Sequence, residues 1–369
     1  MEKTFRRILL TRMKFIGDVV LTTPLIRTLR DTFPDAYLAY LGDAQSVSLL
    51  EHNPYLNEII PFNFSSKGVF SRNTFLEQVR IAALLRKKKF DLAIDLFCNP
   101  RSALLTFATG APVRVGGDLH LRGKLYTIRI RDDGTPKSAI DFHYQSLKAA
   151  GIQPLHYKTE IFLTGKEKAD ALEFLKQQGI DVTKRIVAIH PGATWPSKMW
   201  LPERFAELSG RIAKELSTPA FFTAGPNDLD VIQKVQRLAS GKVFTLPVLP
   251  LRKLAAVLSQ CSVFVTNDCG PMHIAVAVGT PTIGIFGPGE ENIWFPYTQE
   301  FPDGSSKHSA LRKDVPCHPC HLNVCNRTGD EYMECMKLLS VEEVLREVKK
   351  RLVNEKWKIE DKKDLWEKS

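Results

Sequence analysis

A short apolar stretch in the second half of the chain ends in residues that can bind phosphate. Residues 262–267 are mostly apolar and β-branched, as in a buried strand, and Asp268, Cys269 and Gly270 follow them. Pro271 then stands where a first helical position should be. A strand that runs into such a helix points unpaired N–H groups and the positive end of the helix dipole at one spot. This geometry predicts a phosphate site, although an ordinary strand–helix turn of an α/β domain has the same pattern.

A second stretch, HPGATWPSKMW from His190 to Trp200, strengthens the phosphate-site interpretation. We interpret the two stretches as one nucleotide-sugar site that is divided between two loops. The turn after the first expected strand reads RMKFIGDVV, with the single glycine Gly17 in place of a G-x-G-x-x-G motif, and no G-x-x-x-x-G-K-[ST] loop occurs. Dinucleotide-dependent redox chemistry and NTP hydrolysis are therefore disfavoured.

The elements that must position these loops alternate between strands and helices. Strands are expected at 7–11, 36–41, 58–62, 91–96 and around Val113, and again near Ile186, Phe221, Val243, Val263 and Thr282. This alternation indicates parallel, doubly wound sheets of the α/β class. Two such domains facing across a cleft would bring the carboxyl ends of both sheets to a common ligand site.

Length and composition agree with two domains. The chain has 369 residues, more than one hydrophobic core usually serves, with 44% hydrophobic and 25% charged residues. We predict an N-terminal domain over 1–164, a hinge segment over 165–183, a C-terminal domain over 184–340, and a helix with a charged tail over 341–369. Because no apolar run is long enough to span a bilayer and charged residues interrupt the N-terminal stretch, we expect a cytoplasmic protein.

Positive charge is concentrated in the first half. Residues 1–164 contain 23 Lys and Arg and 15 Asp and Glu, a net charge of +8, out of +10 for the whole chain. The densest run, residues 86–89, is typical of a solvated helix end, but the excess over the whole half indicates an anionic partner. Nucleic acid is disfavoured because no aromatic-rich basic strand or recognition-helix pattern is present. An anionic lipid surface or a phosphorylated substrate fits better.

Taken in order, these motifs resemble those of glycosyltransferase family 9, the ADP-heptose:lipopolysaccharide heptosyltransferases. The resemblance rests on the turn with Gly17 and Asp18 and on HPGATWPSKMW, NDCGPMH and FGPGEENIWFP, and it extends over nearly the whole chain. It implies the two-domain GT-B fold and an inverting sugar transfer that needs neither a metal nor another cofactor. It also implies an N-terminal domain that binds the anionic lipid A–core acceptor and a C-terminal domain that binds ADP-heptose. Because this acceptor lies in the cytoplasmic leaflet of the inner membrane, we expect peripheral association with that leaflet.

The resemblance also assigns catalytic and acceptor-binding residues. Asp18, expected at the end of the first strand, matches the family's catalytic carboxylate, which would act as base on the acceptor hydroxyl. An aspartate at this place is also typical of a helix cap. Lys198 matches a lysine that meets the donor diphosphate, where its ammonium would stabilise the leaving group. Lys14 and Arg101 are expected to contact the acceptor.

Donor-binding residues are expected on the loops of the C-terminal domain. The tight turn of Gly192, Ala193 and Thr194 offers backbone N–H groups and one hydroxyl to phosphate. The remaining predicted donor contacts are Gly225, Asn227, Asp268, Cys269, Gly270 and His273. Asp268 would orient sugar hydroxyls or help to hold the donor, and Cys269 and Gly270 would bind phosphate through their backbone. For His273, contact with the diphosphate and packing as a hydrogen-bonded core histidine are nearly equal alternatives.

Four cysteines late in the chain form a separate pattern, C-x2-C-x4-C-x9-C. They are Cys317, Cys320, Cys325 and Cys335. This spacing could hold zinc or an iron–sulfur cluster, although its last two intervals differ from those of a common zinc ribbon. Structural disulfides are not expected in the cytosol. Of the two remaining interpretations, we favour reduced thiols that pack within the loop, and we disfavour a structural metal site.

Two other functions remain open for a chain of this fold. One is an NDP-sugar epimerase or hydrolase, and the other is a non-catalytic sugar-nucleotide binder. The basic N-terminal half and Asp18 favour transfer, because an epimerase needs no large surface for an anionic acceptor.

Overall fold

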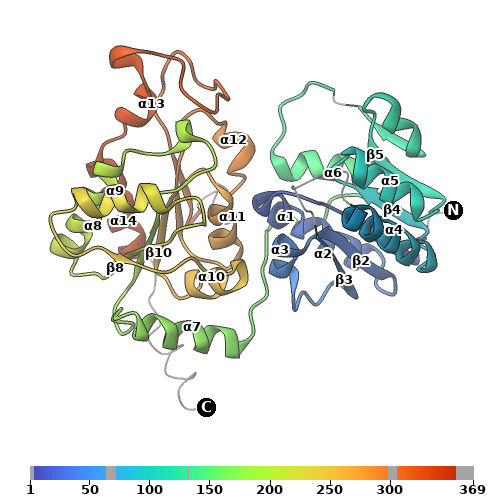
Figure 1. Cartoon of the computed structure of the whole chain (residues 1–369), viewed down its shortest axis with the longest axis horizontal. Helices are drawn as coiled ribbons and strands as arrows, with labels where there is room; N and C mark the ends of the chain where they lie inside the picture. The colour runs from blue at the N-terminus through green and yellow to red at the C-terminus, as the bar shows by residue number, and fades with distance from the viewer. Residues whose placement is uncertain (1–3, 64–71, 132, 298–305, 355–369) are drawn as a thin grey trace. The chain divides into compact units, whose positions relative to one another are not determined.

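The structure, a computed structural model, describes residues 4–63, 72–131, 133–297 and 306–354. The chain divides into two compact units, residues 1–162 and 163–369, each built on one parallel sheet (Figure 1). The predicted hinge segment falls in the second unit, where α7 (Gly165–Gln177) packs against α10 (Leu251–Leu258). In the part of the chain that is described, no helix is both long enough and apolar enough to span a bilayer.

The described strands of the first unit form a six-stranded parallel sheet in the order β3-β2-β1-β4-β5-β6. In this doubly wound order the winding direction reverses between β1 and β4. The strands β1, β2 and β4 are almost wholly buried, because helices cover both faces of a parallel sheet. The strands are β1 (Arg7–Thr11), β2 (Tyr37–Asp43), β3 (Glu58–Phe62), β4 (Leu92–Asp95), β5 (Val113–Gly117) and β6 (Ile128–Ile130).

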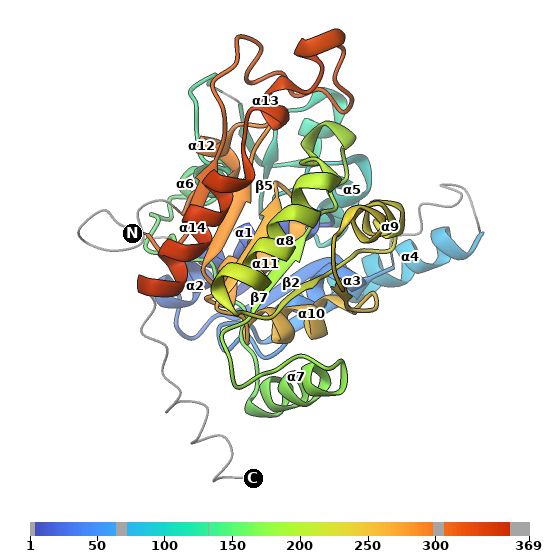
Figure 2. The same ribbon diagram turned by 90° about the vertical axis from the view of Figure 1, so that its left-hand side faces the viewer.

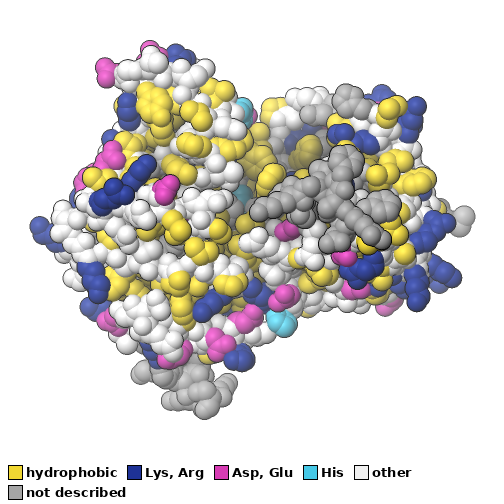
Figure 3. Space-filling model, viewed as in Figure 1, with side chains coloured by type: hydrophobic (Ala, Val, Ile, Leu, Met, Phe, Trp, Pro, Cys, Tyr) yellow, Lys and Arg dark blue, Asp and Glu magenta, His cyan; other side chains and the backbone are white. Residues whose placement is uncertain are grey.

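Two sets of helices cover this first sheet. α4 packs against α5, and their side chains Ile81, Leu85 and Leu105 join the core cluster that β1, β2 and β4 form. α2 packs against α6, which also contacts α1. At the end of α4 the side chains of Arg86, Lys87 and Lys89 are exposed, and Figure 3 shows basic side chains gathered in this region. The helices are α1 (Ile16–Leu21), α2 (Thr23–Thr32), α3 (Ala44–Val47), α4 (Arg72–Lys87), α5 (Pro100–Ala108) and α6 (Ala139–Ala149).

The second unit repeats the winding of the first. Its described strands pair in the order β12-β11-β10-β7-β8-β9, so that the reversal falls between β7 and β10. The strands are β7 (Val187–His190), β8 (Ala220–Phe222), β9 (Phe244–Thr245), β10 (Val263–Asn267), β11 (Thr282–Ile285) and β12 (Ser309–Leu311).

One face of the second sheet is covered by α8, which packs against α9 and α14 (Figure 2). The predicted C-terminal helix is α14, and its Val344, Leu345 and Val348 are fully buried with Trp200 and Phe205 in the core of this unit. The helices are α8 (Pro202–Leu216), α9 (Leu229–Leu238), α11 (Gly270–Ala277), α12 (Glu291–Trp294), α13 (Glu334–Lys337) and α14 (Val341–Asn354).

The structure differs from the sequence prediction in two ways. After the first strand the sequence predicts one helix that continues to Arg30, whereas the structure has two helices, α1 and α2, which meet at Thr22. Pro24 stands in the first turn of α2, where its missing N–H costs no intrahelical hydrogen bond. The strands β6 and β12 were not predicted, because edge strands of three residues carry almost no periodic signal. The helix α6 was not predicted either.

Candidate functional site

Most of the predicted site residues follow the carboxyl ends of the strands at which each sheet reverses its winding. Asp18 follows β1, Arg101 follows β4, and the loops that begin at Pro191 and Asp268 follow β7 and β10. Doubly wound sheets bind their ligands at this position. Each unit therefore contains one candidate site.

In the first unit Asp18 is not at the end of β1, as predicted, but is the third residue of α1. Its Oδ1 lies 2.6 Å from Nη2 of Arg12, and its Oδ2 accepts a 3.3 Å hydrogen bond from the N–H of Phe15. Arg12 in turn donates to the carbonyl of Leu96 at 2.5 Å, and its guanidinium lies 5.1 Å from the ring centroid of Phe97. Both charged side chains are only 11–12% exposed. Asp18 thus takes part in the start of α1 and is also fixed by a buried cation.

The predicted acceptor residues lie in the same unit. Lys14 is half-buried on the loop between β1 and α1. Arg101 is half-buried in the first turn of α5, directly after Asn99, whose side chain caps this helix by accepting the N–H of Ser102 at 2.7 Å.

In the second unit a buried histidine–aspartate pair supports the loop after β7. The imidazole Nε2 of His190 lies 3.4 Å from Oδ2 of Asp228, and its Nδ1 lies 3.0 Å from the hydroxyl of Thr223. Asp228 also accepts the N–H of Gly225 at 2.6 Å. A Cβ on Gly192 would lie 2.2 Å from Cγ of Asp228, so only glycine fits there.

The other predicted residues of these two loops differ in exposure. Ala193 is nearly buried at 9% exposure, whereas Thr194 and Asn227 are exposed. The backbone N–H of Gly225 donates its hydrogen bond to the Asp228 carboxylate, so it is not available to a ligand in this structure.

Asn267 ties the two loops of the second unit together. It is fully buried at the end of β10, and its Nδ2 donates to the carbonyl of Pro191 at 2.8 Å while its Oδ1 accepts the N–H of Trp200 at 3.0 Å. Hydrogen bonds therefore connect the motifs that begin at His190 and Asn267, and the prediction of one divided site requires this proximity.

Lys198 and Asp268 form an ion pair at the centre of this arrangement. Lys198 Nζ lies 2.5 Å from Asp268 Oδ2 and 4.7 Å from the ring centroid of Trp195. Asp268 is 6% exposed, and burial raises its pKa while the ammonium of Lys198 opposes the rise. A Cβ on Gly289 would lie 2.8 Å from Oδ2 of Asp268. The loop between β11 and α12, which contains Gly289, therefore lies close against the ion pair.

The start of α11 lies beside this ion pair. Cys269 is the N-cap residue and Gly270 the first helical residue, so their N–H groups have no intrahelical acceptor. The thiol of Cys269 contacts the hydroxyl of Thr266 at 3.2 Å, and burial raises its pKa to about 12. Its backbone and not its thiol is therefore the group that α11 offers to an anion.

His273 has the burial and the hydrogen bond of the second predicted alternative, and the contact with the diphosphate stays a prediction. It is 4% exposed, and its Nδ1 is hydrogen-bonded to the hydroxyl of Tyr297 at 2.8 Å. Burial, with a smaller effect of the Lys198 charge, lowers its pKa to about 3. It is a neutral histidine packed beneath the loop.

The late cysteines converge on a region outside these sites. All four line one small cavity of about 20 Å³ that also touches Ser197 and Pro288, and burial raises the pKa of Cys335 to about 11, with the other three thiols adding to the rise. All four are free thiols. Among the described residues no group of three or more His, Cys, Asp or Glu is arranged to hold a metal ion.

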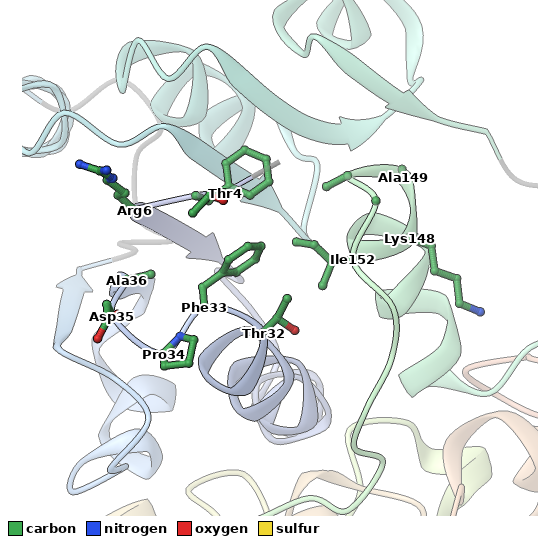
Figure 4. Close-up of a pocket in the computed structure, with 13 residues that line it drawn as sticks. Thr4, Arg6, Thr32, Phe33, Pro34, Asp35, Ala36, Lys148, Ala149 and Ile152 are labelled. Carbon is green, nitrogen blue, oxygen red and sulfur yellow. The ribbon is translucent and has the colours of Figure 1, made fainter. Parts of the chain in front are cut away.

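A larger surface cavity of about 950 Å³ lies at the opposite, amino end of the first sheet (Figure 4). It is lined by the start of β1 and the ends of α2 and α6, with Arg6, Phe33 and Lys148 among its residues. Because it is remote from the carboxyl ends of β1 and β4, it is not part of the candidate site.

Several residues of the sites were missed by sequence reasoning. Arg12 and Asp228 adjoin predicted motifs and could have been included as charged neighbours of a strand end. His143, which lies 3.9 Å from Asp18, gave no signal because α6 itself was not predicted.

Comparison with known proteins places this geometry in a family. Residues 78–321 match the model of glycosyltransferase family 9 (heptosyltransferase). The chain is 26% identical to lipopolysaccharide heptosyltransferase 3 of Escherichia coli K12 over 326 residues, which cover 85% of this chain and 92% of that protein. Its fold is similar to the glycosyl transferase family 9 structure from Veillonella parvula (TM-score 0.82, 25% identity, 96% and 99% covered). It is also similar to E. coli ADP-heptose LPS heptosyltransferase II (TM-score 0.74, 22% identity, 94% and 98% covered). The similarity to these structures shows that the two doubly wound units have the GT-B fold. The family match shows that the chain belongs to glycosyltransferase family 9.

Proposed function

We propose that this protein is an inverting, metal-independent glycosyltransferase that moves heptose from ADP-heptose to the lipid A–Kdo inner core of lipopolysaccharide. Membership of the family and the names of its E. coli relatives support the reaction class. The observation that carries the proposal is the buried Lys198–Asp268 pair beside the start of α11. An ammonium next to a helix N-terminus is suited to a diphosphate, both when it binds and when it leaves.

On the donor side, the diphosphate binds the backbone N–H groups of Cys269 and Gly270 and the turn of residues 192–194. Lys198 exchanges the Asp268 carboxylate for phosphate oxygens, and Asp268 then accepts hydrogen bonds from sugar hydroxyls. Gly225 and Asn227 lie on the next loop along the sheet edge and line the adenosine side.

In the transfer step, the acceptor hydroxyl oxygen bonds to the anomeric carbon while the bond from this carbon to the diphosphate oxygen breaks. Asp18 accepts the hydroxyl proton, and ADP leaves with the electron pair of the broken bond. One displacement of this kind inverts the anomeric configuration. Lys198 and the start of α11 stabilise the charge on ADP, so the mechanism uses neither a metal ion nor a cofactor.

On the acceptor side, Lys14 and Arg101 bind the anionic groups of the core sugars. The net charge of +8 on residues 1–164 favours peripheral association with the cytoplasmic leaflet of the inner membrane, where this acceptor lies. Docking on the leaflet and capture of the acceptor then use the same unit.

The test is incubation of the protein with ADP-heptose and a panel of truncated core lipids, in the presence of EDTA. ADP release that requires a lipid supports transfer. Release without acceptor indicates a hydrolase, change of the sugar without ADP release indicates an epimerase, and binding without turnover indicates a sugar-nucleotide binder. Activity that appears only with magnesium or manganese contradicts the metal-independent step.

A further inference from the structure

His143 of α6 is a buried imidazole, and neither of its nitrogens has a hydrogen bond to the part of the chain that the structure describes. It is 3% exposed, and among the described residues neither Nδ1 nor Nε2 has a hydrogen-bond partner. Buried polar groups in folded proteins almost always have partners, and each exception calls for an explanation. Asp18 lies beside His143, with its Oδ1 3.9 Å from Nε2. This neighbour suggests why an imidazole is kept at this position.

The carboxylate of Asp18 has two differently placed oxygens. Oδ1 faces Nη2 of Arg12 at 2.6 Å and Nε2 of His143 at 3.9 Å, whereas Oδ2 accepts only a long 3.3 Å bond from Phe15. Oδ2 is therefore the oxygen that can turn toward an acceptor hydroxyl. The separation of Nε2 from Oδ1 exceeds that of a hydrogen bond, which needs about 3.2 Å or less, so a rotation of one of the two side chains is needed to form the bond.

We propose that His143 is a positioning residue for Asp18, with its Nε2–H directed at Oδ1 so that Oδ2 stays turned toward the acceptor hydroxyl. The inference rests on the proposed transfer reaction and concerns the residue that orients its base. A neutral donor suits this task, because a second cation beside Arg12 would hinder Asp18 from taking a proton. Burial, with a smaller effect of the Arg12 charge, lowers the pKa of His143 to about 3, so the imidazole is neutral at physiological pH.

The kinetic test compares His143→Leu, which fills the space without a donor, with His143→Gln, which keeps an N–H group. We expect kcat to fall at least tenfold in the Leu variant with little change in the KM for ADP-heptose, and to recover largely in the Gln variant. Tyr144→Phe is the matched control, because it removes a buried hydroxyl of α6 that bonds to Thr28 and not to Asp18. Equal kcat in the Leu variant and the parent protein would overturn the proposal.

A double-mutant cycle and a spectrum separate positioning from packing. In an Asp18→Asn background, His143→Leu should cause no further loss of kcat if His143 acts through Asp18. An additional tenfold loss there would show that it acts elsewhere. The ¹⁵N resonances of the imidazole in the free protein should show the proton on Nε2. A proton on Nδ1 alone would also refute the proposal, and this measurement holds even if the protein fails to transfer heptose, which would refute the proposed function instead.

Discussion

At the scale of single residues, Asp18 can be tested apart from its part in the start of α1. Asn accepts a backbone N–H as well as Asp does, so Asp18→Asn keeps the contact with Phe15 while it removes the base. We expect turnover to fall about a hundredfold or more, the usual range for a lost general base, with ADP-heptose affinity nearly unchanged. The melting temperature should fall, because the buried Arg12 loses its charged partner. Rates of ADP release and calorimetric titration measure the two effects. Retained turnover would exclude Asp18 as the base.

In the proposed reaction, Lys198 contacts negative charge that is present in the bound donor and grows in the transition state. Lys198→Ala should therefore raise the KM for ADP-heptose and lower kcat together. It also leaves Asp268 buried without its cation, so some loss of stability is expected. Lys214→Ala on the exposed surface of α8 is the control and should change neither constant. A change confined to stability would show that the ion pair is structural only.

At the scale of elements, the loop after β7 depends on the absence of a side chain at Gly192. In Gly192→Ala the new Cβ would lie 2.2 Å from Cγ of Asp228, so the loop and the His190–Asp228 pair must shift. We expect at least tenfold weaker ADP binding by calorimetric titration. Gly210→Ala, in the middle of α8, meets nothing within 4 Å and should instead stabilise the protein by about 0.5–1 kcal/mol. Unchanged ADP binding in Gly192→Ala would separate this loop from the donor site.

The same loops show how far the sequence could predict the structure. The apolar run at 262–267 and the glycines of the two motifs are local signals, and they correctly predicted strands that end at one sheet edge. The sequence assigned Lys198 and Asp268 to the same site, but it could not predict that the two side chains form an ion pair. No local sequence pattern specifies a contact between residues 70 positions apart. His143 could not be predicted at all, because its chemistry arises from α6 packing against α1. The roles of these residues stay proposals until the variants are measured.

At the scale of the whole molecule, buried histidines link stability to pH. Burial lowers the pKa of His143, His273 and His308 to about 3, whereas an unfolded histidine has a pKa of about 6.5. Below pH 6.5 the unfolded chain binds protons that the folded chain does not, so stability is full above this pH and is lost as the pH falls. The loss approaches about 1.4 kcal/mol per pH unit for each histidine. Calorimetry should show that the melting temperature falls between pH 7.5 and pH 5. This fall should be less steep in His308→Asn than in the parent protein. In the control His52→Asn, which changes an exposed histidine, the fall should be as steep as in the parent protein.

The uneven charge of the chain predicts how it meets a membrane. With +8 on residues 1–164, binding to vesicles that contain anionic lipid should be strong at low salt and lost at high salt, because the screening length falls to about 3 Å at 1 M. Replacing the exposed Arg86, Lys87 and Lys89 at the end of α4 by Gln should weaken binding by about 1 kcal/mol for each residue near the surface. The matched control replaces exposed cations of the second unit: Lys214, Arg237 and Lys242. Vesicle sedimentation over a salt series measures both variants. Binding that resists salt, or that falls equally in both variants, would show that the charge of the first unit does not direct membrane association.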